Sequence, residues 1–185
     1  MAEEMIRKKS GSKTLDLVYA AAAAALIAVC SWITVPGEVP FTLQTFAVFF
    51  ALYALGGKRG TVAVIVYILL GAVGLPVFSG FKGGIGAILG TTGGYIVGFV
   101  FSALIVWLTE RWQKNIWLKI LFSAAALAVC YAFGTLWFLY VYARNTGPVS
   151  VITALSWCVF PFIPFDAAKL AIAMLLASRL KKHIK

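Results

Sequence analysis

The sequence has few charged residues and little of the chemistry on which most hydrolases and metalloenzymes depend. Only 12% of its 185 residues are charged, and it contains one histidine and three cysteines. His183 lies in a basic tail, and Cys30, Cys130 and Cys158 are isolated in apolar sequence, where buried free cysteine is the expected state. Neither a Ser/His/Asp triad nor a metal-ligand cluster is therefore predicted, and we expect no catalytic residues, metal or cofactor.

A nucleotide-binding loop is also missing. The two glycine-rich runs, residues 83–86 and 90–94, contain no GxxxxGK[ST] pattern. ATP hydrolysis by this chain is not predicted, so any process that it drives must take its energy from an ion gradient or another subunit.

The excess of basic residues does not indicate nucleic-acid binding. The formal net charge is +10, but the lysines and arginines separate apolar segments and form no single patch. The aromatic residues lie within apolar runs, without the basic interleaving that base stacking uses. We predict no nucleic-acid partner.

Apolar residues are abundant. They make up 62% of the sequence, and the mean hydropathy is +0.96, which is too apolar for a water-soluble globule of this size. Since a membrane crossing needs about 20 residues, the length suits one bundle of roughly six helices. We predict an all-α integral membrane protein with a single domain, residues 1–185.

Six apolar segments are predicted as membrane helices. They span about 15–35, 41–55, 61–77, 93–108, 118–142 and 164–180. The second and fourth are short, and their glycine- and proline-rich neighbours suggest broken or re-entrant backbone. Residues 149–160 precede Pro161 and Pro164, which favours a separate short helix near the outer surface.

The distribution of basic residues predicts the orientation. One side carries most of them: Arg7, Lys8, Lys9, Lys13, Lys58, Arg59, Arg111, Lys114, Lys119, Arg179, Lys181, Lys182 and Lys185. The positive-inside rule places this side, and both termini, in the cytoplasm, which requires an even number of crossings. We expect a cytoplasmic N-terminal segment at 1–14, a six-transmembrane-helix bundle at 15–180 and a basic tail at 181–185.

Two ionisable residues lie inside the last apolar segment. Asp166 and Lys169 each cost about 2.5 to 3.5 kcal/mol at the middle of a membrane helix, so they require partners or a function. Their i,i+3 spacing puts them on one helix face in the outer half of the membrane, where they can pair. The alternative is an acid at a helix N-terminus and a lysine that extends toward the surface.

Other candidate site residues follow from the outer connections. Thr42 and Gln44 start the second helix, and the glycines near 78–86 allow close backbone approach. Tyr95 lies next to a stripe of small residues, Gly94, Gly98 and Ser102, which suits close helix contact. Helix capping, tight turns and interfacial aromatic placement are the alternative roles.

The first helix carries six consecutive alanines. Ala21 and Ala25, or Ala20 and Ala24, form stripes of small residues on which another helix can pack. Docking of a partner subunit and burial within this chain's own bundle both remain open.

Several of these motifs together resemble the BioY family, the biotin-capturing S components of energy-coupling-factor transporters. They are VPFTLQT at 39–45, GLPVF at 74–78 with the Gly83-Gly84 pair, GGY at 93–95 and PFIPFDAAK at 161–169. Thr91 departs from the family, which usually has proline there.

The resemblance implies a fold, a location and partners. It implies six helices in a prokaryotic cell membrane, biotin bound from outside, a transmembrane coupling subunit and two ATPases. It also implies that Ala21 and Ala25 meet the coupling subunit.

The resemblance assigns the ligand site most directly to Asp166 and Lys169. The other residues carried over are Thr42, Gln44, Gly83, Gly84 and Tyr95, and the apolar ring of biotin suits Phe41 and Phe78. Asp166 could accept from the ureido N–H groups while Lys169 meets a carboxylate or the ureido oxygen. Rival interpretations are an S component for riboflavin, thiamine or a nicotinate-like compound, a membrane-embedded enzyme and a purely structural subunit.

Overall fold

The computed structural model describes residues 2–181, and the side chains of residues 14–181. The tail residues 182–185, with His183, lie outside the described residues, as do the side chains of the basic N-terminal segment. The elements in chain order are α1 (Ala2–Trp32), β1 (Thr34–Val35), β2 (Phe41–Thr42), α2 (Gln44–Leu55), α3 (Gly57–Ala72), η1 (Ser79–Phe81), α4 (Ile85–Leu89), α5 (Gly93–Thr109), η2 (Glu110–Trp112), α6 (Ile116–Asn145), α7 (Val151–Cys158) and α8 (Phe162–Leu180).

Each of the six predicted apolar segments overlaps one helix, namely α1, α2, α3, α5, α6 or α8, and α7 is the separate short helix predicted before the prolines. The start of α1 differs most from expectation, because the helix begins at Ala2 and continues through the segment 1–14 that was predicted to precede it. The ends of α3 also differ. It begins at Gly57, because Gly56 with φ of +88° turns the chain within one residue. It ends at Ala72, shortly before Pro76, which disfavours helix in the residue that precedes it.

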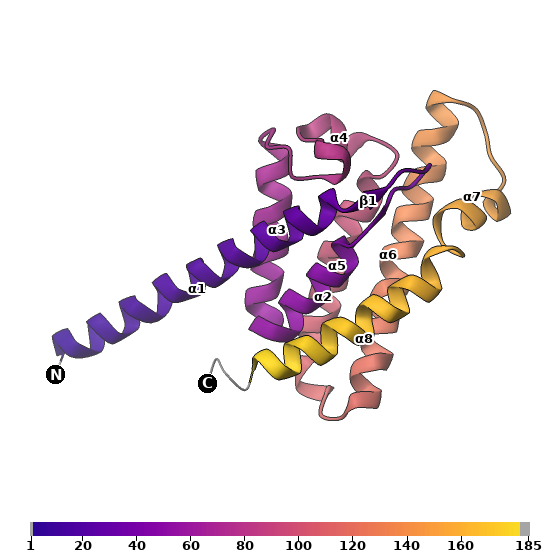
Figure 1. Ribbon diagram of the computed structural model, residues 1–185. Coiled ribbons are helices and arrows are strands. Elements are labelled where there is room, and N and C mark those ends of the chain that lie inside the picture. Colours follow the sequence, from indigo (N-terminus) through magenta and orange to yellow (C-terminus); the bar gives the residue numbers. More distant parts are fainter. Residues whose placement is uncertain (1, 182–185) are drawn as a thin grey trace.

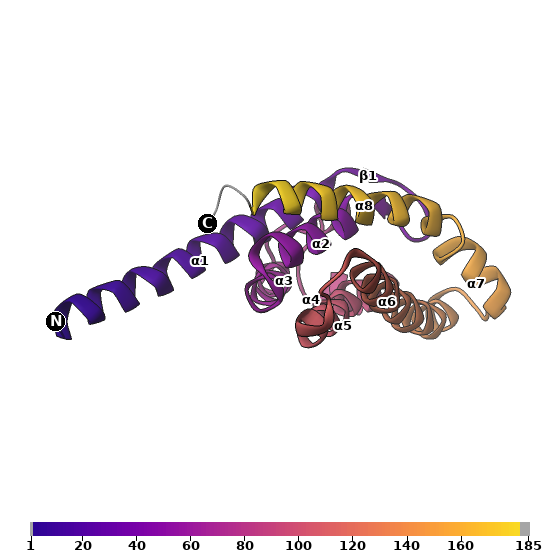
Figure 2. The same cartoon turned by 90° about the horizontal axis from the view of Figure 1, so that it is seen from below.

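The helices form two groups that enclose the site between them. α8 packs on α2, and α1 packs on both α2 and α3, while α5 packs on α6 and on α3. Figure 2 shows α5 and α6 on one side and α1, α2 and α8 on the other. The α2–α3 and α5–α6 turns lie at one end of the bundle, and the β1–β2 hairpin, α4 and α7 lie at the other (Figure 1).

The small-residue stripe predicted on α5 is a close helix contact. Gly94 lies against Trp137 and Gly98 against Cys130, both on α6. Ser102 donates a hydrogen bond from its hydroxyl to the Ala126 carbonyl oxygen at 2.8 Å. Without side-chain bulk at these positions, the two helices approach closely along their length.

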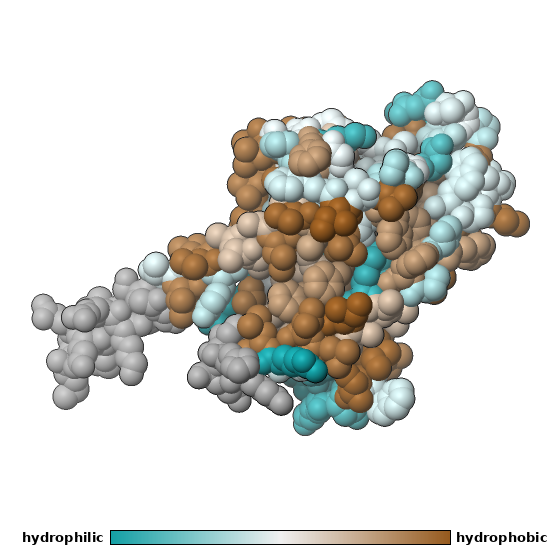
Figure 3. All heavy atoms as spheres, in the orientation of Figure 1, coloured by the Kyte–Doolittle hydropathy of each residue, from teal (hydrophilic) through white to brown (hydrophobic). Residues whose placement is uncertain are grey.

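The surface and the helix lengths are those of a multi-pass membrane protein. Large apolar side chains are exposed on most helices, and Figure 3 shows them gathered over the middle of the bundle. Among the described residues, four stretches are long and apolar enough to cross a membrane: 14–32, 93–112, 116–145 and 151–180. The two-residue strands β1 and β2, which were not predicted, form a small antiparallel hairpin that positions Thr42.

Irregular backbone lies where glycines and prolines flank the two short helices. α2 and α5 are themselves continuous, whereas residues 73–92 contain η1, α4 and three glycines with positive φ. This segment bends over the bundle end and lines the candidate site.

Candidate functional site

A cavity of about 530 Å³ lies at the end of the bundle formed by the hairpin, α4 and α7. Its wall comes from the hairpin, α2, segment 78–92, α5, α6, α7 and α8. Seven of the nine predicted ligand residues line it: Thr42, Gln44, Phe78, Gly83, Tyr95, Asp166 and Lys169. The volume is within the range of small-molecule sites.

Asp166 and Lys169 form a buried ion pair in the cavity wall. Their exposed fractions are 2% and 6%, and Lys169 Nζ lies 2.8 Å from Asp166 Oδ1. The predicted pairing is confirmed, and the alternative of a lysine extended to the surface is wrong. Each group offsets part of the cost of burying the other in a site shielded from water.

The Lys169 ammonium group and the Asp166 carboxylate also contact other residues. Lys169 Nζ donates to the Thr42 carbonyl oxygen at 2.6 Å and lies 3.7 Å from the centroid of the Phe41 ring. Asp166 Oδ2 accepts a hydrogen bond from the Tyr131 hydroxyl at 2.6 Å. The ammonium group is thus surrounded by protein, whereas the carboxylate keeps acceptor capacity beyond its two bonds.

Phe41 and Gly84 are not brought into the cavity wall. Phe41 packs instead against Phe165, with ring centroids 5.0 Å apart, and against Lys169. Gly84 has φ of +86° and donates its N–H to the Gly71 carbonyl oxygen at 2.7 Å. Phe41 therefore supports the lysine, and Gly84 has the turn role that was the alternative for these glycines.

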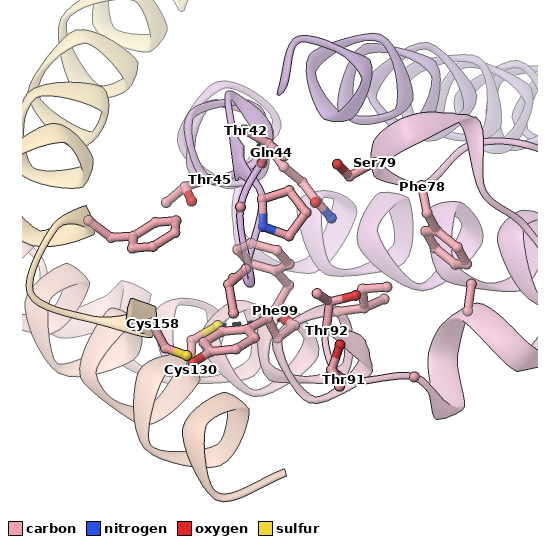
Figure 4. A pocket seen from close by; sticks show the side chains of 18 of the residues that line it. Thr42, Gln44, Thr45, Phe78, Ser79, Thr91, Thr92, Phe99, Cys130 and Cys158 are labelled. Atoms are coloured by element: carbon pink, nitrogen blue, oxygen red, sulfur yellow. Dashed lines mark hydrogen bonds between the residues drawn. The ribbon is translucent and has the colours of Figure 1, made fainter. Parts of the chain in front are cut away.

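Gln44 and Thr42 combine structural and lining roles. The Gln44 side-chain amide donates to the Tyr67 hydroxyl at 3.2 Å. The Thr42 hydroxyl accepts from the Gln44 backbone N–H, also at 3.2 Å. These contacts fix both residues at the start of α2, with part of each side chain facing the cavity (Figure 4).

Tyr95 is held between α5 and α6. Its hydroxyl lies 2.9 Å from the Thr135 hydroxyl, and its ring packs against Gly134. Tyr95 thus lines the cavity while its hydroxyl is engaged with Thr135 of α6.

Several lining residues were missed from the sequence. Tyr131 belongs to α6, where no local sequence pattern distinguishes it from the other aromatic residues of an apolar helix. Figure 4 shows Phe99, Cys130 and Cys158 on one side of the cavity, across from Ser79. Thr91, the position where the BioY family usually has proline, also lines the cavity and adds a hydroxyl group that proline lacks.

The charged residues that line the cavity differ in exposure. Asp166 and Lys169 are buried, whereas the other charged lining residues, Glu38 and Lys82, are exposed. Among the described residues, neither Glu38 nor Lys82 forms an ion pair. The buried pair can therefore meet a polar ligand group that is shielded from water, and the exposed charges can meet a charged group near water.

Known proteins resemble this chain along most of its length. The BioY family model matches residues 5–185. "Biotin transporter BioY" of Thermotoga maritima is 43% identical over 168 residues, which cover 90% of this chain and 96% of that protein. "Probable biotin transporter BioY" of Pyrococcus horikoshii is 41% identical over 145 residues, covering 78% and 82%.

A solved structure has the same fold. It is the crystal structure of the S component for biotin from an ECF-type ABC transporter. The TM-score is 0.80 at 25% identity, and the match covers 93% of each chain.

Proposed function

Because this chain belongs to the BioY family, we propose that it is the biotin-capturing S component of an ECF-type transporter. The relatives that it matches are transporter components, not enzymes. The observation that carries the proposal is the cavity of about 530 Å³ with the Asp166–Lys169 pair buried in its wall. A ureido group offers N–H donors, and Asp166 offers the acceptor that they need.

We propose that biotin lies with its ureido ring at Asp166 and its carboxylate at Lys82. Lys169 is already held by Asp166 and the Thr42 carbonyl oxygen, so it is a poor partner for a second anion. Lys82 lines the same cavity, is exposed and has no ion pair among the described residues. Phe78 and Phe99 supply apolar wall for the thiophane ring and the valerate chain.

The proposed topology has six crossings with both termini in the cytoplasm of a prokaryotic cell. Lys58 and Arg59 follow the α2–α3 turn, and Arg111 and Lys114 lie in the α5–α6 connection. Both connections are at the same end of the bundle (Figure 1). The positive-inside rule assigns this end to the cytoplasm, so the cavity opens toward the outside and captures external biotin.

The proposed partners are a transmembrane coupling subunit and two ATPases. Ala21 and Ala25 are exposed on α1, whereas Ala20 and Ala24 are 4% and 1% exposed. Ala20 and Ala24 pack inside this chain's own bundle, so they are withdrawn from the expected partner surface. The remaining stripe, Ala21 and Ala25, offers a flat surface for a helix of the coupling subunit.

Ala21→Trp with Ala25→Trp is expected to prevent assembly with the coupling subunit and to leave biotin binding unchanged, because the stripe is remote from the cavity. Co-purification of the tagged chain with coexpressed transporter subunits measures assembly. Val62→Trp on exposed α3 is the control and should assemble normally. Assembly of the double variant at the level of the control contradicts the assignment.

The function is tested by identifying what the protein binds. Small molecules that copurify with the detergent-solubilised chain are extracted and identified by mass spectrometry. The ligand-free protein is then titrated calorimetrically with biotin, riboflavin, thiamine and nicotinate. Saturable binding of biotin alone supports the proposal, and binding of another vitamin in its place overturns it.

Lys82→Gln is expected to weaken biotin binding about tenfold, equivalent to about 1.4 kcal/mol, since one charge-assisted hydrogen bond at an exposed position is lost. Biotin methyl ester, which lacks the carboxylate charge, should bind the variant and the unaltered protein equally well. Lys58→Gln at the opposite end of the bundle serves as control. An equal loss for biotin and its methyl ester would show that Lys82 does not contact the carboxylate.

A further inference from the structure

A second cavity of about 530 Å³ lies between α6 and α8. The first half of α6 and the second half of α8 form most of its wall, and Tyr53 of α2 contributes a side chain. α8 packs mainly on α2 and α6 mainly on α5, so α6 and α8 face each other across this groove with few direct contacts. The groove is separate from the ligand cavity and shares no lining residue with it.

The wall of the groove is apolar and accessible from the membrane. Ile120 and Leu175 are exposed, at 45% and 64%, and Ala124 and Ala171 leave space between the helices. From Ala167 to Lys181 the groove follows α8 for about 21 Å at 1.5 Å per residue. This exceeds half of the roughly 30 Å hydrocarbon core, so the groove is long enough for an acyl chain of one leaflet.

Two lysines line the groove at one end. Lys119 is in the first turn of α6, and Lys181 directly follows the last residue of α8. Among the described residues, neither lysine forms an ion pair, and no Asp or Glu lines the groove. Two uncompensated positive charges next to an apolar slot complement an anionic lipid headgroup.

We propose that this groove binds one anionic phospholipid, with an acyl chain between α6 and α8 and the phosphate between Lys119 and Lys181. The basic end is the one that also carries Lys58 and Lys114, so the lipid belongs to the leaflet on that side. A lipid bound there fills the space between the two helices, and its phosphate bridges Lys119 of α6 and Lys181 at the end of α8.

Native mass spectrometry of the detergent-solubilised chain tests the site. Phosphatidylglycerol and phosphatidylcholine with the same acyl chains are added in turn. The unaltered protein should retain phosphatidylglycerol at least tenfold more than phosphatidylcholine. Lys119→Gln with Lys181→Gln should remove this preference, whereas the control Lys58→Gln with Lys114→Gln, at the same end but outside the groove, should keep it.

A groove-filling variant tests the acyl-chain position independently of charge. Ala171→Phe should reduce retention of both lipids severalfold, and biotin titration verifies that each variant is folded. Equal retention of the two lipids, loss of the preference in the control, or displacement of the lipid by inorganic phosphate overturns the proposal. A lipid-free dimer that Ala171→Phe abolishes also overturns it, because a second copy of the chain would then occupy the groove.

Discussion

Lys169→Met is expected to lower biotin affinity at least 100-fold and to destabilise the protein. The substitution leaves the Asp166 carboxylate 2% exposed, with the Tyr131 hydroxyl as its one remaining hydrogen-bond partner among the described side chains. Removing one partner of a buried ion pair costs about 3 to 5 kcal/mol. The Thr42 carbonyl oxygen loses its donor at the same time, so one contact between the hairpin and α8 is lost. Calorimetric titration measures the affinity, and thermal unfolding in detergent measures the stability.

A double variant separates the structural role of the pair from its role in binding. Asp166→Asn together with Lys169→Met removes both charges and should recover part of the stability that Lys169→Met loses. Biotin binding should stay weak in the double variant, because an amide is a poorer acceptor for the ureido N–H groups than a carboxylate. Lys114→Met, an exposed substitution outside the site, should change neither quantity. Binding of biotin by Lys169→Met with the affinity of the unaltered protein contradicts the site assignment.

The sequence predicts this pair well because charge in an apolar helix is costly and therefore conspicuous. Asp166 and Lys169 stand out in their segment, and i,i+3 spacing on a helix leaves few alternatives to mutual contact. The long helices are likewise predictable from apolar length alone, and Pro161 and Pro164 mark the break before α8. Their boundaries shift where one glycine makes a turn, as Gly56 does between α2 and α3.

Other features could not be predicted because several arrangements satisfy the same pattern. Residues 20–25 are all alanine, so the sequence does not show which face of α1 points into the bundle. The two alanine stripes are equivalent by sequence, and the structure shows that the one with Ala24 is buried. Tyr131 becomes a site residue only when α6 brings it to Asp166, 35 residues away in sequence. The location of Phe41 beneath Lys169 depends on the β1–β2 hairpin, whose two-residue strands are too short for a periodic signal.

Gly98→Leu is expected to lower the thermal unfolding midpoint by about 2 to 12 °C, because overpacking a close contact costs about 1 to 3 kcal/mol and each kcal/mol shifts the midpoint of a chain of this size by about 2 to 4 °C. A Cβ atom at residue 98 would lie 2.8 Å from Cys130 Sγ and 3.2 Å from Cys130 Cα. The second of these atoms belongs to the α6 backbone, so the helices must separate to admit a leucine. Ala128→Leu, on an exposed part of α6, adds similar volume without this contact and should leave the midpoint unchanged.

The contact between α5 and α6 also borders the ligand cavity, so its loss should lower biotin affinity as well as stability. Tyr95 lies one turn before Gly98 on α5, and Cys130 itself lines the cavity. Separation of α5 from α6 would disturb the Tyr95–Thr135 hydrogen bond and the wall around it, so biotin affinity should fall together with stability. Gly98→Ala should cause a smaller loss, and adding Cys130→Ala should restore part of it by removing the sulfur nearest the new methyl group. An unfolding midpoint for Gly98→Leu equal to that of Ala128→Leu would mean that close approach of α5 and α6 does not stabilise the bundle.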